Sequence, residues 1–159
     1  MDVRLVWSYI SVKPMLKLSK KADYALIAVR HLATPGMERS QSASDIAEAY
    51  GISATLLAKV LQRLAKHGLV TARHGSSGGY QLARPAKDIS ALEVISAVDG
   101  PLVITSCITN RGNCGQSTNC TVREPLRRVN ESIVQVLSAV KISQMTEDSP
   151  DIELVALST

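Results

Sequence analysis

Phenylalanine is absent from the 159-residue chain, and aromatic residues as a group make up only 3% of it. A core with so few aromatic side chains must be built from aliphatic ones, and hydrophobic residues of all kinds reach 45%. Leu, Ile, Val and Ala in these proportions favour helices whose apolar faces pack together. The length is typical of one domain, or of one small domain with an appendage.

Long apolar runs are also missing, since no stretch approaches the ~20 apolar residues of a membrane-spanning helix. The apolar segment 5–12 is short, and Lys13 and Pro14 follow it without the small-residue cleavage site of a signal peptide. We therefore expect a cytoplasmic protein with no membrane partner. Residues 1–14 stand apart from the pattern that follows, as an N-terminal extension or a mis-assigned start before Met15.

Three helices are predicted in the first half of the chain, each preceded by a serine suited to cap its N-terminus. They cover residues 20–33, about 43–50 and about 54–66, with Ser19, Ser42 and Ser53 as the caps. Apolar residues recur on one side of each helix at helical spacing, including Tyr24, Ile46, Tyr50 and Leu57. Because Gly51 joins the second and third helices, a helix-turn-helix is expected.

Two short strands are predicted next, over residues 69–73 and 80–83, with the glycine-rich stretch 74–79 between them. A hairpin directly after the second helix of a helix-turn-helix is a wing. Ser90 and Glu93 form a capping box that opens a further helix to about residue 98. These elements predict a winged helix-turn-helix DNA-binding domain over residues 15–100.

A long helix is predicted over residues 123–144, with Pro125 in its first turn. Its apolar residues are spaced almost as in a coiled coil: Leu126, Val129, Ile133, Val136, Leu137 and Val140. Such a stripe has nowhere to be buried in so small a domain, so a homodimer is expected. The fold class is mainly α with a small β-wing, with a cysteine loop over 101–122 and an acidic flexible tail over 145–159.

Acidic residues are absent between Ala49 and Lys87, whereas six Lys and Arg residues fall within that stretch. This segregation coincides with the third helix and the wing, which favours phosphate contacts over a merely solvated basic face. The N-terminal end of such a helix reads base edges. The residues predicted to bind double-stranded DNA are Lys20, Ser53, Thr55, Lys59, Arg63, Arg73 and His74.

All three cysteines lie in one polar loop, Cys107, Cys114 and Cys120, with six and five residues between them. The surrounding Asn, Gly and Ser residues favour turns that let three thiols meet, and an odd number argues against a disulfide framework. Thiolates suit zinc or an iron–sulfur cluster, but zinc sites usually contain closely spaced cysteine pairs. Metal or cluster binding is the first interpretation, a thiol redox switch the second and inert cysteines the third.

Together these features resemble the IscR/NsrR-type winged-helix regulators that carry iron–sulfur clusters, over about residues 15–140. The resemblance depends on the three cysteines and on residues 16–26 (LKLSKKADYAL), 45–53 (DIAEAYGIS), 61–70 (LQRLAKHGLV), 78–82 (GGYQL) and 93–100 (EVISAVDG). It implies a homodimeric transcription regulator whose affinity for palindromic promoter DNA changes with the state of a 2Fe–2S or 4Fe–4S cluster. Likeness to regulators of the SUF operon implies control of cluster-assembly genes.

The resemblance also implies a fourth cluster ligand. Where the IscR type has a histidine three residues after its last cysteine, this chain has Arg123, which is no ligand. The NsrR type uses an aspartate of the first helix, donated by the partner subunit, and Asp23 stands at that position; Glu124 is a weaker candidate. Without the resemblance, Asp23 is interpreted as a solvated carboxylate in the first helical turn, where its charge interacts favourably with the helix dipole.

Three alternatives remain beside the cluster-responsive regulator. Two are regulators: a cluster-free thiol-redox regulator, and a nitric-oxide-responsive repressor of the NsrR type. The third is a metal-binding adaptor or scaffold that never touches DNA. An enzyme is not expected, because no His, Asp and Ser constellation is visible. The histidines His31, His67 and His74 stand where helix ends and the wing account for them.

Overall fold

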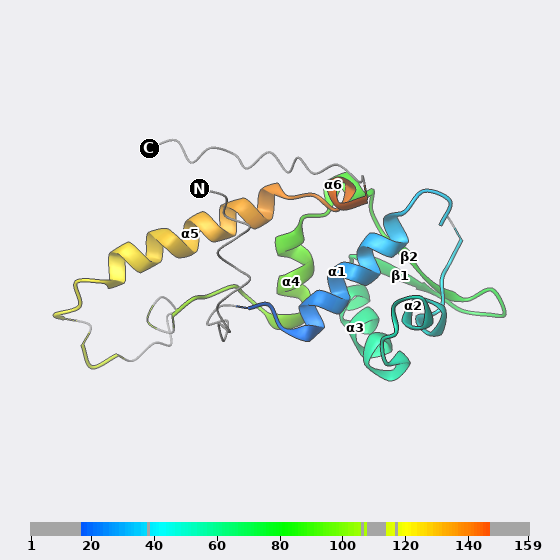
Figure 1. The fold of residues 1–159 in the computed structure, drawn as a ribbon, viewed down its shortest axis with the longest axis horizontal. Coiled ribbons are helices and arrows are strands. Elements are labelled where there is room, and N and C mark those ends of the chain that lie inside the picture. Colours follow the sequence, from blue (N-terminus) through cyan, green and yellow to red (C-terminus); the bar gives the residue numbers. More distant parts are fainter. Residues whose placement is uncertain (1–16, 38, 106, 108–113, 117, 147–159) are drawn as a thin grey trace, which may run out of the picture.

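Figure 1 shows the fold as a computed structural model, in which residues 17–37, 39–105, 107, 114–116 and 118–146 are described. The elements in chain order are α1 (Lys20–Ala33), α2 (Ala43–Tyr50), α3 (Ala54–Lys66), β1 (Val70–Arg73), β2 (Gly79–Leu82), the 3₁₀-helix η1 (Ala86–Asp88), α4 (Ala91–Asp99), α5 (Arg123–Ala139) and α6 (Ile142–Thr146). This part of the chain is mainly helical with one two-stranded sheet, which confirms the predicted fold class. None of its helices is long and apolar enough to cross a membrane.

Serine residues begin the helices at the predicted places. Ser19 Oγ accepts a hydrogen bond from Ala22 N at 3.1 Å, and Ser42 and Ser90 each form a complete capping box. Ser53 occupies the N-cap position of α3, but its side chain makes no capping hydrogen bond. The predicted starts of these helices are therefore correct, but Ser53 does not cap α3 with its hydroxyl as predicted.

Helix α1 lies in the middle of the core, in contact with α3, α4 and α6. Its fully buried residues Ala22, Ala25 and Ala28 are small, so neighbouring helices approach it closely. The largest fully buried side chains of the surrounding elements are Ile46, Leu57, Leu61, Leu64, Ile89, Val94 and Ile142. Aliphatic packing thus dominates the core, as the absence of phenylalanine predicts.

Tyr50 is a correction to the predicted inner side of α2. Its side chain is 40% exposed, and its hydroxyl lies 3.1 Å from His31 Nδ1, with the two rings edge to face. The phenol keeps its polar end at the surface because the hydroxyl needs a hydrogen-bond partner. Partial burial in this contact lowers the pKa of His31 below its usual value.

Helices α2 and α3 form the predicted helix-turn-helix. Gly51 ends α2 in the left-handed conformation, with φ of +63°, and Ile52 N donates to Ala47 O at 2.8 Å. Glycine adopts this conformation without the steric cost that other residues pay, so the turn is encoded locally. The wing follows, with β1 antiparallel to β2 and Arg73 opposite Gly79.

A third segment extends the wing, which the sequence did not predict. Gln41 N donates to Tyr80 O at 2.9 Å, and Tyr80 N donates to Gln41 O at 2.8 Å. Gly79 permits this approach, since a Cβ atom there would lie 2.5 Å from Gln41 O. The wing is thereby fixed to the residues that open α2.

Helix α5 extends away from the winged domain (Figure 1) and ends before Val140, short of the predicted end at residue 144. The chain turns there because Ile142 N donates to Ile89 O at 2.9 Å and the Ile142 side chain is fully buried. Helix α6 then packs against α1, where Arg30 Nε donates to Met145 O at 2.7 Å.

The end of the chain therefore differs from its predicted division. The helix that was predicted to mediate dimerisation is shorter than residues 123–144, and residues 145–146 of the predicted tail belong to α6. Residues 147–159 and the predicted N-terminal extension, 1–14, lie outside the described residues.

Candidate DNA-binding surface and cysteine segment

Helix α3 has one buried side and one exposed side. The buried side packs into the core through Leu57, Val60, Leu61 and Leu64. Thr55, Lys59 and Arg63 lie on the exposed side. Solvent exposure of one helix face is what entry into a major groove requires, so α3 fits the role of a recognition helix.

The first turn of α3 presents small side chains. Ser53, Ala54 and Thr55 are all exposed, and the hydroxyl of Ser53 is not used as a cap. Small residues let a helix approach base edges closely, and hydroxyls either donate or accept hydrogen bonds there. This turn is suited to reading bases.

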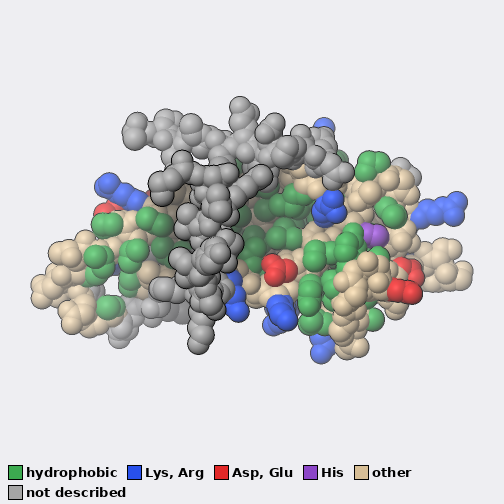
Figure 2. Space-filling model, in the orientation of Figure 1, with side chains coloured by type: hydrophobic (Ala, Val, Ile, Leu, Met, Phe, Trp, Pro, Cys, Tyr) green, Lys and Arg blue, Asp and Glu red, His purple; other side chains and the backbone are tan. Residues whose placement is uncertain are grey.

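Arg63 differs from the other predicted DNA contacts because it already has a protein partner. Its Nη1 donates to Val98 O at 2.6 Å, in the last turn of α4. Arg63 and Lys59 line one hollow, together with Lys21 of α1. Lys20 is exposed at the start of α1. Figure 2 shows Lys and Arg side chains at the lower edge of the molecule, near the start of α1.

The wing carries a second group of charged residues. Arg73 ends β1, and His74 is exposed in the hairpin loop. Arg73 lines a hollow with Arg39, and Asp45 of α2 lines the same hollow. Sequence reasoning missed Arg39, because only the pairing of residue 41 with the wing brings it there and no local pattern encodes that pairing.

The cysteine segment, residues 101–122, is described at its three cysteines but not at residues 106, 108–113 and 117. Within the described residues, no group of three or more Cys, His, Asp or Glu side chains is placed to hold a metal ion. Cys107 and Cys120 are half-buried, Cys114 is exposed, and all three are free thiols. Thr105 Oγ1 lies 2.9 Å from Cys107 Sγ. Residues 108–113 lie outside the described part, so the predicted convergence stays a prediction.

Cys120 lines a hollow at the start of α5 with Arg123, Glu124 and Arg127. Arg127 Nε donates to Glu124 Oε2 at 2.8 Å, and its Nη2 donates to Glu124 Oε1 at 2.5 Å. These hydrogen bonds from the guanidinium lower the pKa of Glu124 to about 2. Glu124, the weaker candidate for a fourth ligand, is thus held in an ion pair. Asp23 is exposed in the first turn of α1.

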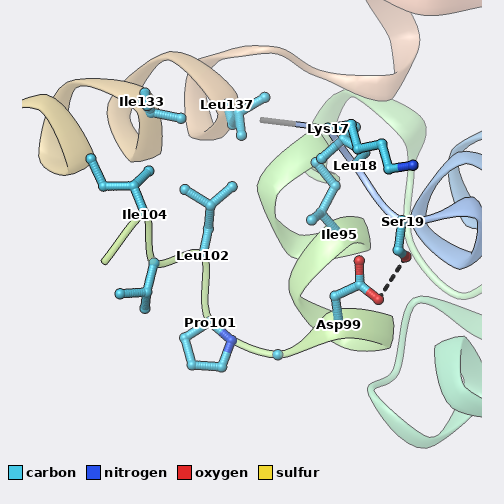
Figure 3. A pocket seen from close by; sticks show the side chains of 12 residues that line it. Lys17, Leu18, Ser19, Ile95, Asp99, Pro101, Leu102, Ile104, Ile133 and Leu137 are labelled. Carbon is cyan, nitrogen blue, oxygen red and sulfur yellow. Dashed lines mark hydrogen bonds between the residues drawn. The ribbon is translucent and has the colours of Figure 1, made fainter. Parts of the chain in front are cut away.

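The residues before Cys107 are attached to α5 through a buried amide. Asn130 is only 8% exposed, and its Oδ1 accepts a hydrogen bond from Ile104 N at 3.0 Å. Ile133 and Leu137 of α5 line an apolar pocket with Leu102 and Ile95 (Figure 3). One part of the α5 stripe therefore packs against its own chain.

Another part of the stripe is left uncovered. Val129 is 49% exposed and Val122, just before the helix, is 56% exposed. Figure 2 shows hydrophobic side chains at the surface on the side of the molecule where α5 lies. The described part of one chain therefore leaves some of the apolar residues of α5 exposed to solvent.

These elements define the chain as a winged helix-turn-helix DNA-binding protein with a projecting helix and a cysteine segment. It belongs to the Rrf2 family of iron-dependent transcriptional regulators, whose model matches residues 18–148. Members of this family are transcription regulators and not enzymes.

Individual relatives agree with this assignment. The chain is 32% identical over 139 residues to the HTH-type transcriptional regulator IscR of Vibrio vulnificus (strain YJ016), which covers 87% of this chain and 82% of that protein. It is similar to the structure of T. potens IscR, with 30% identity, a TM-score of 0.65 and coverage of 82% and 86%. It is also similar to CymR (YrzC), the global cysteine regulator of B. subtilis, with 26% identity, a TM-score of 0.67 and coverage of 83% and 97%.

Proposed function

We propose that the protein is a cytoplasmic, homodimeric regulator whose operator affinity responds to an iron–sulfur cluster held by Cys107, Cys114 and Cys120. The observation that carries this proposal is the position of the cysteine segment. It lies between α4, whose end is bonded to the recognition helix, and α5, whose apolar stripe is partly uncovered. A change at the cysteines would therefore act on both DNA reading and subunit pairing.

The DNA-binding part of the proposal is supported by the exposed face of α3. Ser53 and Thr55 would contact base edges from the first turn, with Lys59 on the same exposed side. Arg73 and His74 would approach the flanking DNA from the wing, and Lys20 would contact phosphate. In a dimer, two such surfaces bind half-sites about one helical turn, ~34 Å, apart.

The dimer part is supported by the uncovered stripe on α5. A second copy would bury Val129 together with neighbouring apolar residues of the stripe: Leu126, Val136 and Val140. Ile133 and Leu137 of the predicted set line the pocket within their own chain and would border this interface. Burial of exposed apolar area is the main driving force for such pairing. The two α5 helices would then set the distance between the two α3 helices.

The cluster part depends on the chemistry of the donors. Three thiols in one segment fit an iron–sulfur cluster, which when bound supplies a centre sensitive to oxidation and to iron. Three thiolates leave one position, for which Asp23 of the partner subunit is the candidate. The Thr105 hydroxyl, 2.9 Å from Cys107 Sγ, would donate to the thiolate and hold its orientation. The target genes we propose are those of cluster assembly.

A second candidate function is direct thiol oxidation without a cluster. The exposure of Cys114 and the partial exposure of Cys107 and Cys120 support it, because an oxidant can reach accessible thiols. Oxidation of Cys107 or Cys120 would then alter the residues between α4 and α5.

Anaerobic purification separates the two functions. A cluster protein should be coloured and contain iron and acid-labile sulfide, and Cys114→Ser should lose both. Asp23→Ala should change cluster retention or the visible spectrum if that carboxylate is the fourth ligand. A colourless, iron-free wild type whose DNA binding responds to peroxide would instead support thiol oxidation. Absence of DNA binding in every state would overturn both.

A further inference from the structure

A basic hollow lies between α1, α3 and the end of α4. Four cationic side chains line it, one from α1 and three from α3: Lys21, Lys59, Arg63 and Lys66. Its other lining residues are Leu56, Val60, Gln62 and Val98, so the lining contains no carboxylate. Gathered like charges repel one another, and an anion placed among them relieves that repulsion.

Arg63 is the lining residue whose side chain is held in place by a hydrogen bond within the protein. Its Nη1 is bonded to Val98 O at 2.6 Å, which holds the guanidinium against the end of α4. Asp99, which directly follows the lining residue Val98, does not line the hollow. Its Oδ1 accepts a hydrogen bond from Ser19 Oγ at 2.8 Å, and its side chain lines the apolar pocket of Figure 3. Lys21 and Lys59 are exposed and remain mobile donors on their flexible stems.

The hollow also lies on the flank of the proposed recognition helix. Lys59 follows the base-reading turn by one helical turn, on the exposed side of α3. When such a helix enters a major groove, the phosphates that border the groove run along its flanks. The anion nearest to this hollow in a DNA complex would therefore be a backbone phosphate.

We propose that this hollow is a binding site, or seat, for one DNA backbone phosphate per subunit. Lys21 and Lys59 would both bind that phosphate, and Arg63 would be a positioning residue that holds α3 against the end of α4. The proposal rests on the proposed DNA-binding function. It assigns Lys21 a direct role, and it makes the two lysines bind one phosphate together rather than two phosphates separately.

The salt dependence of binding tests this sharing. The probe is a fluorescent duplex selected from a random-sequence library for tight binding to the wild-type protein. Each neutralised phosphate contributes about 0.9 to the slope of log K against log salt concentration. The double variant Lys21→Ala/Lys59→Ala should therefore lose about 0.9 per bound subunit. Each single variant should lose less, because one lysine still neutralises the phosphate.

The control is the double variant Arg128→Ala/Lys141→Ala, which removes the same charge from residues outside the hollow and should keep the wild-type slope. A slope loss of about 1.8 per bound subunit would show two separate phosphate contacts and overturn the shared seat. If the Lys21→Ala/Lys59→Ala variant has the same slope as the control, neither lysine contacts a phosphate and the proposal is overturned. If no duplex is selected by the wild type, the proposed function itself fails together with the seat.

Phosphate-ethylation interference gives an independent readout. Wild type should lose binding when one particular phosphate in each half-site is ethylated, and the Lys21→Ala/Lys59→Ala variant should no longer be sensitive at that position. Retained sensitivity at every wild-type position would contradict the seat. The single and double variants of Lys21 and Lys59 should keep the wild-type thermal unfolding curve, since both lysines are exposed.

Discussion

At the scale of single residues, Lys59 and Arg63 stand one helical turn apart on α3, yet their surroundings differ. Both side chains are exposed, but Arg63 Nη1 also donates to Val98 O at 2.6 Å. We expect Arg63→Ala to lower the free energy of unfolding by about 1–2 kcal/mol, because a hydrogen bond from a charged donor is lost. Lys59→Ala should change it by less than about 0.5 kcal/mol. Urea denaturation of both variants measures the difference, and equal effects would show that the Val98 contact contributes nothing.

Glu124 provides a residue-scale prediction about protonation. Its pKa is lowered to about 2, chiefly by hydrogen bonds from Arg127. A carboxylate with a lowered folded-state pKa stabilises the fold above its unfolded pKa, and this contribution disappears as the pH falls through the folded value. The effect should be small because the pair is exposed. In an NMR titration, Arg127→Ala should raise the pKa of Glu124 toward its ordinary value, whereas Ser138→Ala should leave it unchanged.

At the scale of helices and strands, local signals predicted most boundaries correctly. Ser19, Ser42 and Ser90 cap helices, and Gly51 ends one in the left-handed conformation, so each end depends on residues a few positions apart. The end of α5 could not be predicted in this way. Its predicted apolar spacing runs to Val140 without a local stop signal. Two distant backbone hydrogen bonds, from Ala91 N to Val140 O and from Ile142 N to Ile89 O, mark the break between α5 and α6.

The candidate site shows the same division between local and distant causes. The exposed face of α3 follows from helical spacing, so Thr55 and Lys59 could be placed from the sequence. Arg39 could not, because the pairing of Gln41 with Tyr80 joins segments far apart in the chain. The partner of Arg63, Val98 O, is a backbone atom of another helix, which no pattern of side chains predicts.

Asn130 gives a prediction at the element scale, because it joins α5 to the residues before Cys107. Its Oδ1 accepts from Ile104 N at 3.0 Å in a site that is 8% exposed. Asn130→Ala should leave the Ile104 amide without its acceptor and lower the free energy of unfolding by about 1–3 kcal/mol.

Hydrogen exchange at the Ile104 amide measures the local effect. Exchange should become faster in Asn130→Ala, while Gln135→Ala, on the exposed side of α5, should leave it unchanged. Unchanged exchange in both variants would show that Asn130 does not hold this segment.

At the scale of the whole molecule, the cysteine segment connects two helices, α4 and α5, that have different contacts. The end of α4 contacts the proposed recognition helix, α3, through the bond from Arg63 to Val98 O, and Asn130 of α5 accepts a hydrogen bond from Ile104 N. Helix α5 projects from the winged domain with part of its apolar stripe uncovered (Figure 1). A change in the cysteine segment would thus reach both the DNA-reading face and the proposed subunit interface through short chains of contacts.

The proposed dimer can be tested at Val129, whose side chain is 49% exposed on the apolar face of α5. A carboxylate at this position would have to be desolvated in the paired helices, which opposes association. We expect Val129→Asp to be monomeric in sedimentation velocity at concentrations where wild type is dimeric. Its affinity for a two-half-site duplex should fall at least tenfold, because the two half-sites are no longer bound by one linked pair.

The matched control is Ser138→Asp, which adds the same charge nine residues further along α5 and therefore on the opposite side of the helix. It should remain dimeric and keep wild-type affinity. A dimeric Val129→Asp variant would show that subunits pair through another surface, so α5 would not set the distance between the two recognition helices. Loss of pairing with unchanged affinity would instead show that single subunits bind DNA independently, which contradicts a role of α5 in operator recognition.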